Sequence, residues 1–205
     1  KHNLGYGFKG NHFIEIQFVE EIFDEIAARG AGLSKNQLVI MYHGGGGAVP
    51  YHVGRFYGNR KKKTPKKFFL FLMKLWFHFG SLEGLRNFRL RWRYYFHPHT
   101  FDEISMSSPE GQRIYAATKA ALNYSYAFRV ATVARIQDAL TKVLSGETAK
   151  LELITDVIHN SIVKENIRGK DVFVHRHTAN RVWPGKITIV SGYNNTSSYL
   201  ALGLE

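Results

Sequence analysis

The chain has 205 residues, of which 44% are hydrophobic and 14% aromatic, a composition that excludes a disordered polypeptide and predicts one folded domain. It carries 28 Lys and Arg against 16 Asp and Glu, a net charge of +12, which favours RNA, DNA or nucleotides as partners, with a solvated basic surface as the alternative. The absence of Cys excludes disulfides and thiolate chemistry within these residues and predicts a cytoplasmic protein. The most apolar run, residues 68–80, is too short and too interrupted to span a membrane, so no membrane partner is expected.

The first fifty residues predict two strands and a helix. Residues 12–19 alternate and are rich in β-branched and aromatic side chains, which is typical of a strand. Residues 20–32 have apolar side chains at helical spacing before Gly30 and Gly32, which predicts a helix. Residues 37–43 predict a short buried strand, and the glycine-rich segment 44–50 predicts a turn that can approach a ligand closely.

Residues 60–97 form a basic, aromatic insertion, which starts with the charge run RKKKTPKK and continues with aromatic residues mixed with Arg. One interpretation is an RNA-contacting insertion, with charges on phosphates and aromatic rings available for stacking. The alternative is a helical excursion with solvated Lys and a buried aromatic side. The two interpretations carry equal weight from the sequence.

The longest predicted helix covers residues 107–146, from a Ser-Pro-Glu entry to Gly146, with apolar residues at helical spacing between them. Four short β-like runs follow, at residues 151–160, 171–176, 185–192 and 197–203. Strands with interspersed helices and no regular βαβ alternation predict an α+β fold. We expect a single mixed domain over residues 1–205, with a β-strand core surrounded by helices.

Three of the ten His residues stand at predicted strand ends, beside small or amide side chains: His12, His43 and His159. Imidazoles that converge from strand ends can bind a metal ion. Because the three are far apart in the sequence, structural or surface roles remain open at this point.

Six motifs occur in order along the chain: LGYGFKGNHFIEI, VIMYHGGGG, SPEGQRIYAATKAALNYSYAFR, DVIHN, VHRHTANR and SGYNNTSSYLALG. Together they resemble the core of the RtcB-type RNA-splicing ligase family, and the resemblance covers the whole chain except the basic insertion. It implies an RtcB-like fold.

The resemblance also implies site residues. By this likeness a two-manganese centre has three histidine ligands here, His12, His43 and His159. The residues implied to contact the phosphates or the guanine of GTP are Asn11, Phe13, Glu15, Asn160 and Ser198. Paired divalent ions can neutralise triphosphate charge and align an in-line displacement, and imidazole suits manganese.

The activity that the resemblance implies is GTP-dependent RNA ligation in tRNA splicing or RNA repair. A 3′-phosphate or 2′,3′-cyclic phosphate RNA end is joined to a 5′-hydroxyl end through a guanylylated His and an activated RNA guanylate. The expected partners are RNA, GTP and an archease-like activator.

The chain departs from the family pattern in several places. The bridging Cys and the guanylylated His of the family are expected before Lys1 and beyond Glu205, so the catalytic nucleophile is not assigned here. A Ser-Gly-Ser-Arg turn is replaced by four glycines at 44–47, Tyr193 stands in a Ser position and His177 in a Lys position. For Arg176 and Arg181, contact with RNA phosphate and a structural salt bridge remain equally open.

Two other functions stay open. A ligase-derived protein could bind RNA or nucleotide without catalysis. A metal-dependent phosphoesterase fits less well, because Asn11, Phe13, Glu15 and Ser198 suit a guanine nucleotide.

Overall fold

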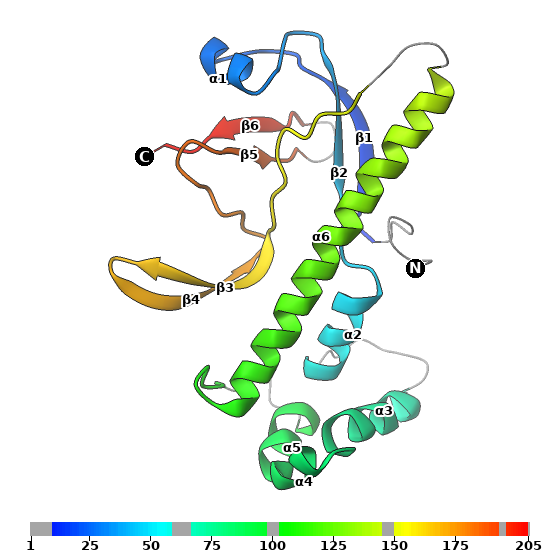
Figure 1. The fold of residues 1–205 in the computed structure, drawn as a ribbon, viewed down its shortest axis with the longest axis vertical. Helices are drawn as coiled ribbons and strands as arrows, with labels where there is room; N and C mark the ends of the chain where they lie inside the picture. The colour runs from blue at the N-terminus through cyan, green and yellow to red at the C-terminus, as the bar shows by residue number, and fades with distance from the viewer. Residues whose placement is uncertain (1–9, 59–66, 98–102, 145–149, 193–195, 205) are drawn as a thin grey trace. The chain divides into compact units, whose positions relative to one another are not determined.

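A computed structural model describes residues 10–58, 67–97, 103–144, 150–192 and 196–204. Helices and antiparallel strand pairs are mixed along the chain, which confirms the predicted α+β class (Figure 1). The elements in chain order are β1 (Phe13–Phe18), α1 (Glu25–Gly30), β2 (Leu38–His43), α2 (Ala48–Tyr57), α3 (Lys67–Phe79), α4 (Leu82–Arg86), α5 (Phe88–Phe96), α6 (Pro109–Val143), β3 (Asn160–Ile167), β4 (Lys170–His177), β5 (Ile187–Val190) and β6 (Tyr199–Leu202).

The chain divides into two compact units. The first comprises Lys1–Gly45 and Phe128–Glu205, and the second is Gly46–Ala127. All the described strands belong to the first unit, whereas α2 to α5 belong to the second, and α6 contributes residues to both.

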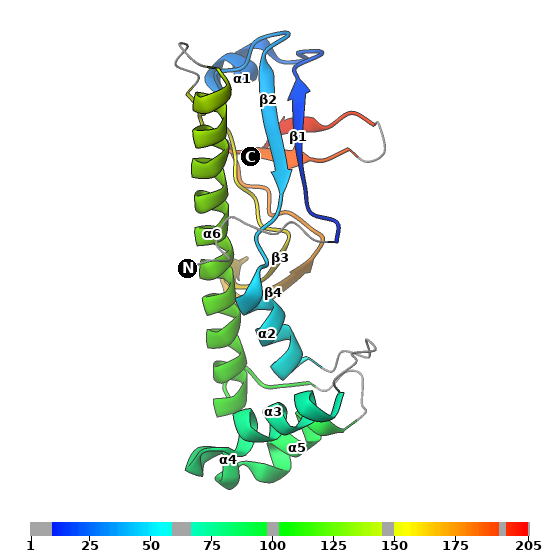
Figure 2. The ribbon, with the colours of Figure 1, turned by 90° about the vertical axis from the view of Figure 1, so that its right-hand side faces the viewer.

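The strands of the first unit form three separate antiparallel pairs, β1 with β2, β3 with β4 and β5 with β6. Figure 2 shows β1 and β2 running side by side in opposite directions. Their register pairs Phe13 with His43 and Phe18 with Leu38, so both predicted strands are confirmed. The prediction that 37–43 is buried is wrong, because Met41 alone of the strand is buried and Leu38 is 72% exposed.

The helix predicted over residues 20–32 is shorter than expected. It begins at Glu25, because the Asp24 carboxylate accepts hydrogen bonds from the backbone N–H groups of Ile26 and Ala27 at 3.0 and 2.9 Å. A side chain that caps the first free amides fixes the helix start. Residues 20–23 precede this cap and are not helical.

The β-like run predicted at 151–160 is wrong except at its last residue, since β3 starts at Asn160. Side chains hold this extended segment in place of a strand partner. The Gln137 side chain, on α6, accepts a hydrogen bond from the Leu151 amide at 2.7 Å, and the Thr155 hydroxyl donates to the Ile187 carbonyl at 2.7 Å. The other three predicted runs overlap β4, β5 and β6.

Helix α6 has 35 residues and is the longest of the described helices, as predicted. The Ser108 hydroxyl accepts a hydrogen bond from the Gly111 amide at 3.0 Å, and Pro109 occupies the first helical position. Both features favour a helix start at this point. The helix ends at Val143, three residues before the predicted end at Gly146, which lies outside the described residues.

In the second unit, the described part of the basic insertion forms α3, α4 and α5. The second interpretation is confirmed in that this part is helical and Lys67 is exposed, but its burial pattern is wrong for the rest of α3. Lys74 is buried and donates to the Tyr95 carbonyl at 3.0 Å, whereas Phe68 and Trp76 are 73% and 79% exposed. Residues 60–66 of the charge run lie outside the described residues.

A buried polar network joins α5 to the start of α6. Glu110 accepts hydrogen bonds from the Tyr95 hydroxyl at 2.6 Å and from Arg91 Nε at 3.2 Å. Arg91 also donates to the His78 carbonyl at 2.6 Å and to Glu83 at 3.1 Å. Because Arg91 and Glu110 are almost fully buried, each charge depends on the other for compensation.

His78 is fully buried within this network and its imidazole stacks on Tyr95. Its Nε2 donates to the Phe56 carbonyl at 2.9 Å, and Nδ1 has no hydrogen-bond partner. Burial lowers the pKa of His78 to about 4, and Arg113 and Lys74 act in the same direction against the opposing effect of the Phe56 hydrogen bond. The folded protein therefore holds this ring in its neutral form.

We expect acid to destabilise the second unit through His78. The stabilisation is complete above the unfolded pKa of 6.5 and is lost as the pH falls towards the folded pKa of about 4. Over that window the free energy of unfolding should fall by about 3 kcal/mol. Urea denaturation between these pH values measures the fall, and His78→Gln, whose amide can still donate but does not titrate, should remove most of it.

None of the described helices is both long enough and apolar enough to cross a membrane.

Candidate metal and nucleotide site

Three imidazoles from separate parts of the first unit lie together. The β1–β2 register places His12 beside His43, and their ring centroids are 5.2 Å apart. His159 immediately precedes β3, and the centroid of its ring lies 5.0 Å from the centroid of the His43 ring. The structure therefore brings together the three histidines that the sequence analysis selected, with His43 in the centre.

The strand end that carries His43 is held by α6. The hydroxyl of Tyr42, next to His43, donates to the Arg129 carbonyl at 3.0 Å. The Arg129 side chain forms two hydrogen bonds to Asp156, of 2.6 and 2.9 Å, three residues before His159. Burial raises the pKa of Tyr42 to about 12, and Asp156 adds to this effect. Arg129 has a structural role here, and Tyr42 and Asp156 are positioning residues that the sequence analysis missed.

Two of the three histidines, His12 and His159, have lowered pKa values, which favours the form that a metal ion requires. Burial lowers the pKa of His12, and its neighbour His43 lowers it further. Burial likewise lowers the pKa of His159, with additional effects from the surrounding imidazoles and Arg129. The neutral imidazole is the metal-ligating form.

The ring nitrogens also have a suitable tautomeric arrangement. His43 Nδ1 is 3.1 Å from the Asn11 carbonyl oxygen, to which it can donate. A backbone carbonyl on one ring nitrogen fixes the tautomer and leaves Nε2 as the potential metal ligand. Within the described parts of the chain, no group of three or more His, Cys, Asp or Glu side chains is placed so that it could already hold a metal ion. The donor chemistry fits a metal, and binding requires the rings to adjust.

The predicted nucleotide-binding residues divide into two groups. Asn11 and Phe13 flank His12, and the Phe13 ring lies 5.7 Å from the His43 ring. Glu15 is on the same face of β1 as Phe13, because side chains alternate along a strand, and it accepts a hydrogen bond from Gln17 at 2.9 Å. Ser198 lies before β6, where its hydroxyl accepts a hydrogen bond from the Gly192 amide at 2.9 Å. Guanine contacts by these residues stay a prediction.

Asn160, which is predicted to contact phosphate, has its side-chain oxygen in contact with other residues of the chain. Its side-chain oxygen interacts with His177 Nδ1 at 2.9 Å and accepts a hydrogen bond from the Thr178 amide at 3.0 Å. His177, which stands where the family has Lys, is also one of the groups that lower the pKa of His159. The Asn160 side chain thus links the third histidine to the end of β4.

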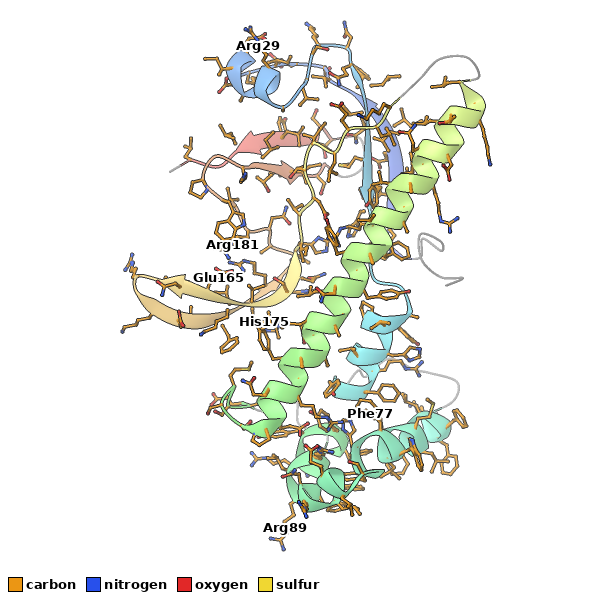
Figure 3. The ribbon with its side chains drawn as sticks, viewed as in Figure 1. Arg29, Phe77, Arg89, Glu165, His175 and Arg181 are labelled. Atoms are coloured by element: carbon orange, nitrogen blue, oxygen red, sulfur yellow. The ribbon has the colours of Figure 1, made fainter. Side chains whose placement is uncertain are left out.

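The two arginines predicted to contact phosphate share one carboxylate. Arg176 forms a bidentate ion pair with Glu165, and Arg181 Nη1 lies 2.9 Å from the same carboxylate. Figure 3 shows Glu165 and Arg181 close together, and the Arg181 guanidinium covers the Trp183 ring at 3.1 Å. Hydrogen bonding by Arg176 lowers the pKa of Glu165. These contacts support the structural alternative for both arginines, and phosphate binding stays a prediction.

The glycine turn after His43 is shorter than predicted, because α2 begins at Ala48. Gly45 and Gly47 have φ angles of 127° and 50°, a region that disfavours residues with side chains. A Cβ at Gly47 would lie 2.9 Å from the Tyr124 ring. The turn therefore offers backbone groups and no arginine. The other departure, Tyr193, lies outside the described residues.

Three clustered imidazoles at or next to strand ends, with Asn11 and Phe13 on either side of His12, place the chain in the class of candidate metal-binding proteins. The sequence model of the family described as tRNA-splicing ligase RtcB matches residues 2–205. The chain belongs to this family, as the ordered motifs predict.

Curated relatives agree with this assignment. The tRNA-splicing ligase RtcB of Methanococcus maripaludis is 31% identical over 221 residues, which cover 98% of this chain and 41% of that protein. The proteins of the same name from Pyrococcus horikoshii and Thermococcus kodakarensis are 27% and 26% identical, with 98% of this chain and 23% and 41% of their own lengths covered. The chain spans less than half the length of each of these relatives.

Proposed function

We propose that the protein is a GTP- and manganese-dependent RNA ligase that joins 3′-phosphate or 2′,3′-cyclic phosphate ends to 5′-hydroxyl ends in tRNA splicing or RNA repair. The observation that carries the proposal is the convergence of His12, His43 and His159 in a member of a tRNA-splicing ligase family. RNA is the substrate class that the family name supports. A cytoplasmic location and an archease-like activator belong to the same proposal.

In this proposal the imidazoles of His12, His43 and His159 would hold manganese through ring nitrogens, and burial lowers the pKa of His12 and of His159, which favours their neutral form. Bound ions would supply positive charge that neutralises phosphate oxygens and aligns the reacting groups. Asn11 and Phe13, which directly precede and follow His12, would orient the nucleotide beside that charge. Tyr42 and Arg129 keep the end of β2 in place.

The proposed route uses a covalent histidine nucleophile, which we do not assign to any of the residues named above. A histidine attacks the α-phosphate of GTP with loss of pyrophosphate, and the guanylyl group then passes to the RNA 3′-phosphate. The 5′-hydroxyl oxygen attacks that phosphate and GMP leaves, so one difficult displacement is divided into easier ones. We expect the nucleophile outside these 205 residues.

The proposal is tested with the natural polypeptide and two RNA strands, one with a 3′-phosphate and the other with a 5′-hydroxyl. We expect a joined product that requires both GTP and manganese, and transfer of label to the protein from GTP labelled at the α-phosphate. Strands with a 3′-hydroxyl end and a 5′-phosphate are the control and should not be joined. No product from the matching strands, with both cofactors present, contradicts the proposal.

Binding measurements separate this function from its alternatives. Calorimetry that shows both manganese and GTP binding supports a ligase. Manganese binding without GTP binding indicates a phosphoesterase, and RNA binding without manganese indicates a protein that has lost catalysis.

A further inference from the structure

A further imidazole lies beside the histidine cluster. His177 is the last residue of β4, and the β3–β4 register sets it opposite Asn160, the residue after His159. After burial and His43, His177 is the strongest of the groups that lower the pKa of His159, ahead of His12, which belongs to the cluster. His177 is therefore within electrostatic reach of the His159 ring, although the proposed ligand set does not include it.

The turn after β4 fixes His177 against the segment that carries His159. The Asn160 side-chain oxygen lies 2.9 Å from His177 Nδ1 and accepts a hydrogen bond from the Thr178 amide at 3.0 Å. The Ala179 amide donates to the His159 carbonyl at 3.1 Å. Thr178 has a φ angle of 57°, which is unfavourable for a β-branched residue and persists only where the surroundings hold it. These contacts keep His177 in a defined place next to His159.

The hydrogen bonds of Asn160 determine the tautomer of His177. Because a backbone N–H can only donate, the Asn160 atom that the Thr178 amide contacts is an acceptor oxygen. That oxygen cannot donate, so His177 Nδ1 carries the hydrogen in their contact, and the lone pair of the neutral ring is on Nε2. His43 has the same arrangement, with Nδ1 beside the Asn11 carbonyl oxygen. An oxygen that holds one ring nitrogen is typical of metal-binding histidines.

The residue type at this position changes what the site can bind. A lysine, which the family has here, is a cation without a lone pair and repels a metal ion. A neutral imidazole adds no charge and supplies a nitrogen lone pair. His177 thus brings donor chemistry that the family pattern lacks at this position.

Two arginines beside the site are turned to carboxylates. Arg176 directly precedes His177 in β4, so its side chain lies on the other face of the strand, where it pairs with Glu165. Arg129, on α6, forms two hydrogen bonds to Asp156. Because each guanidinium has a carboxylate close to it, these arginines oppose a cation at the imidazoles less than unpaired charges would.

We propose that His177 is a further metal ligand of this site, which binds through Nε2 on the side of His159. The inference rests on the proposed manganese site and extends its ligand set beyond His12, His43 and His159. Since no three such ligands are already in place within the described residues, the His177 ring must adjust toward the ion together with the cluster. Its contact with Asn160 allows this, because Asn160 directly follows His159 in the chain.

Two other roles would use the ring differently. As a phosphate contact in place of lysine, Nε2 would have to donate a hydrogen bond, which the neutral tautomer does not allow. As a structural residue, His177 would act only through Nδ1 and its contact with Asn160. The metal and structural roles depend on different nitrogens, so a substitution that keeps one nitrogen and removes the other separates them.

The test compares His177→Asn with the unchanged natural polypeptide by calorimetric titration with manganese alone. The asparagine amide can still donate to Asn160 from a position close to that of Nδ1, but it has no group in the place of Nε2. We expect a loss of manganese affinity of at least about tenfold, the smaller of the losses typical for outer partners of a metal site. Electron spin-echo spectroscopy at saturating manganese, which detects directly bonded nitrogen, should show one ligand nitrogen fewer.

His177→Lys is the second variant and restores the family residue. It removes the same lone pair and adds a cation, so it should lose at least as much manganese affinity as His177→Asn. Far-UV circular dichroism of both variants should match that of the unchanged protein. If His177→Asn does not fold, His177→Lys provides the same comparison.

His175→Asn is the matched control, because His175 is an exposed histidine two residues earlier on the same strand (Figure 3). It should bind manganese as the unchanged protein does. Unchanged affinity and an unchanged nitrogen signal in His177→Asn overturn the inference, and so does an equal loss in His175→Asn. A loss of affinity with an unchanged nitrogen signal also overturns it, because His177 would then act only by positioning other ligands.

The outcomes separate this inference from the proposed function. Manganese binding that is lost in His43→Ala but kept in His177→Asn refutes only the further ligand. A natural polypeptide that binds no manganese refutes both the further ligand and the manganese-dependent function. Manganese bound through His177 in a protein that does not join RNA refutes only the proposed catalysis.

Discussion

Replacing His43 with alanine is expected to abolish manganese binding by the chain and RNA ligation by the natural polypeptide. His43 is the central imidazole, since its ring lies 5.2 Å from His12 and 5.0 Å from His159. Removal of a ligand that links the other two should weaken metal affinity by more than the about 10- to 100-fold that loss of an outer-shell partner costs. Calorimetric titration with manganese measures the loss directly, without any need for turnover.

The fold should survive this substitution, because His43 is half-buried and its ring bonds to a backbone carbonyl, that of Asn11. His175→Ala is the matched control, since His175 is an exposed histidine on β4 in the same unit. It should bind manganese and support ligation normally. Ligation that persists in His43→Ala would show that the imidazole cluster is not the metal site.

The sequence predicts the strands around the candidate site well, because the signals there are local. Alternation over residues 12–19 and the compact run 37–43 each place a histidine at a strand end. The antiparallel register of β1 and β2 then brings His12 and His43 together without any long-range information. His159 reaches them from more than a hundred residues away, and it was selected as the end of a predicted strand, 151–160, of which the structure contains only Asn160.

Long-range polar contacts were the part that the sequence could not supply. Nothing in the pattern around Arg176 and Arg181 indicates that both pair with Glu165, because the outcome depends on the β3–β4 register. The same is true of the contact between Tyr42 and the Arg129 carbonyl. A recognisable signal existed for Asp156 alone, three residues before His159 in the DVIHN motif.

The start of α1 and the burial of Lys74 in α3 were mispredicted for a different reason. Apolar spacing predicted a helix from residue 20, whereas the Asp24 side chain caps it at Glu25. In α3 the charge pattern suggested solvated lysines, yet Lys74 is buried because the Tyr95 carbonyl accepts its hydrogen bond. Burial lowers the pKa of Lys74 accordingly. In both cases specific hydrogen bonds decide what the sequence pattern alone did not.

The buried network of the second unit predicts the largest effect on stability. Glu110→Ala is expected to lower the free energy of unfolding by about 3 to 5 kcal/mol, because it leaves the buried Arg91 without its buried counter-charge. It also removes the acceptor of the Tyr95 hydroxyl, 2.6 Å away. Urea denaturation followed by tryptophan fluorescence reports mainly on this unit, since Trp76 and Trp92, two of the three tryptophans, lie in it.

Glu83→Ala provides the matched control, because Glu83 pairs with the same arginine at 3.1 Å but its side chain is 66% exposed. Exposed ion pairs contribute about 0 to 1 kcal/mol, so this variant should lose no more than that. If Glu110→Ala lowers the free energy of unfolding by several kcal/mol more than Glu83→Ala does, the stability comes from burial of the Arg91–Glu110 pair. If the two losses are equal, burial of the Arg91–Glu110 pair contributes no more stability than the exposed pair with Glu83.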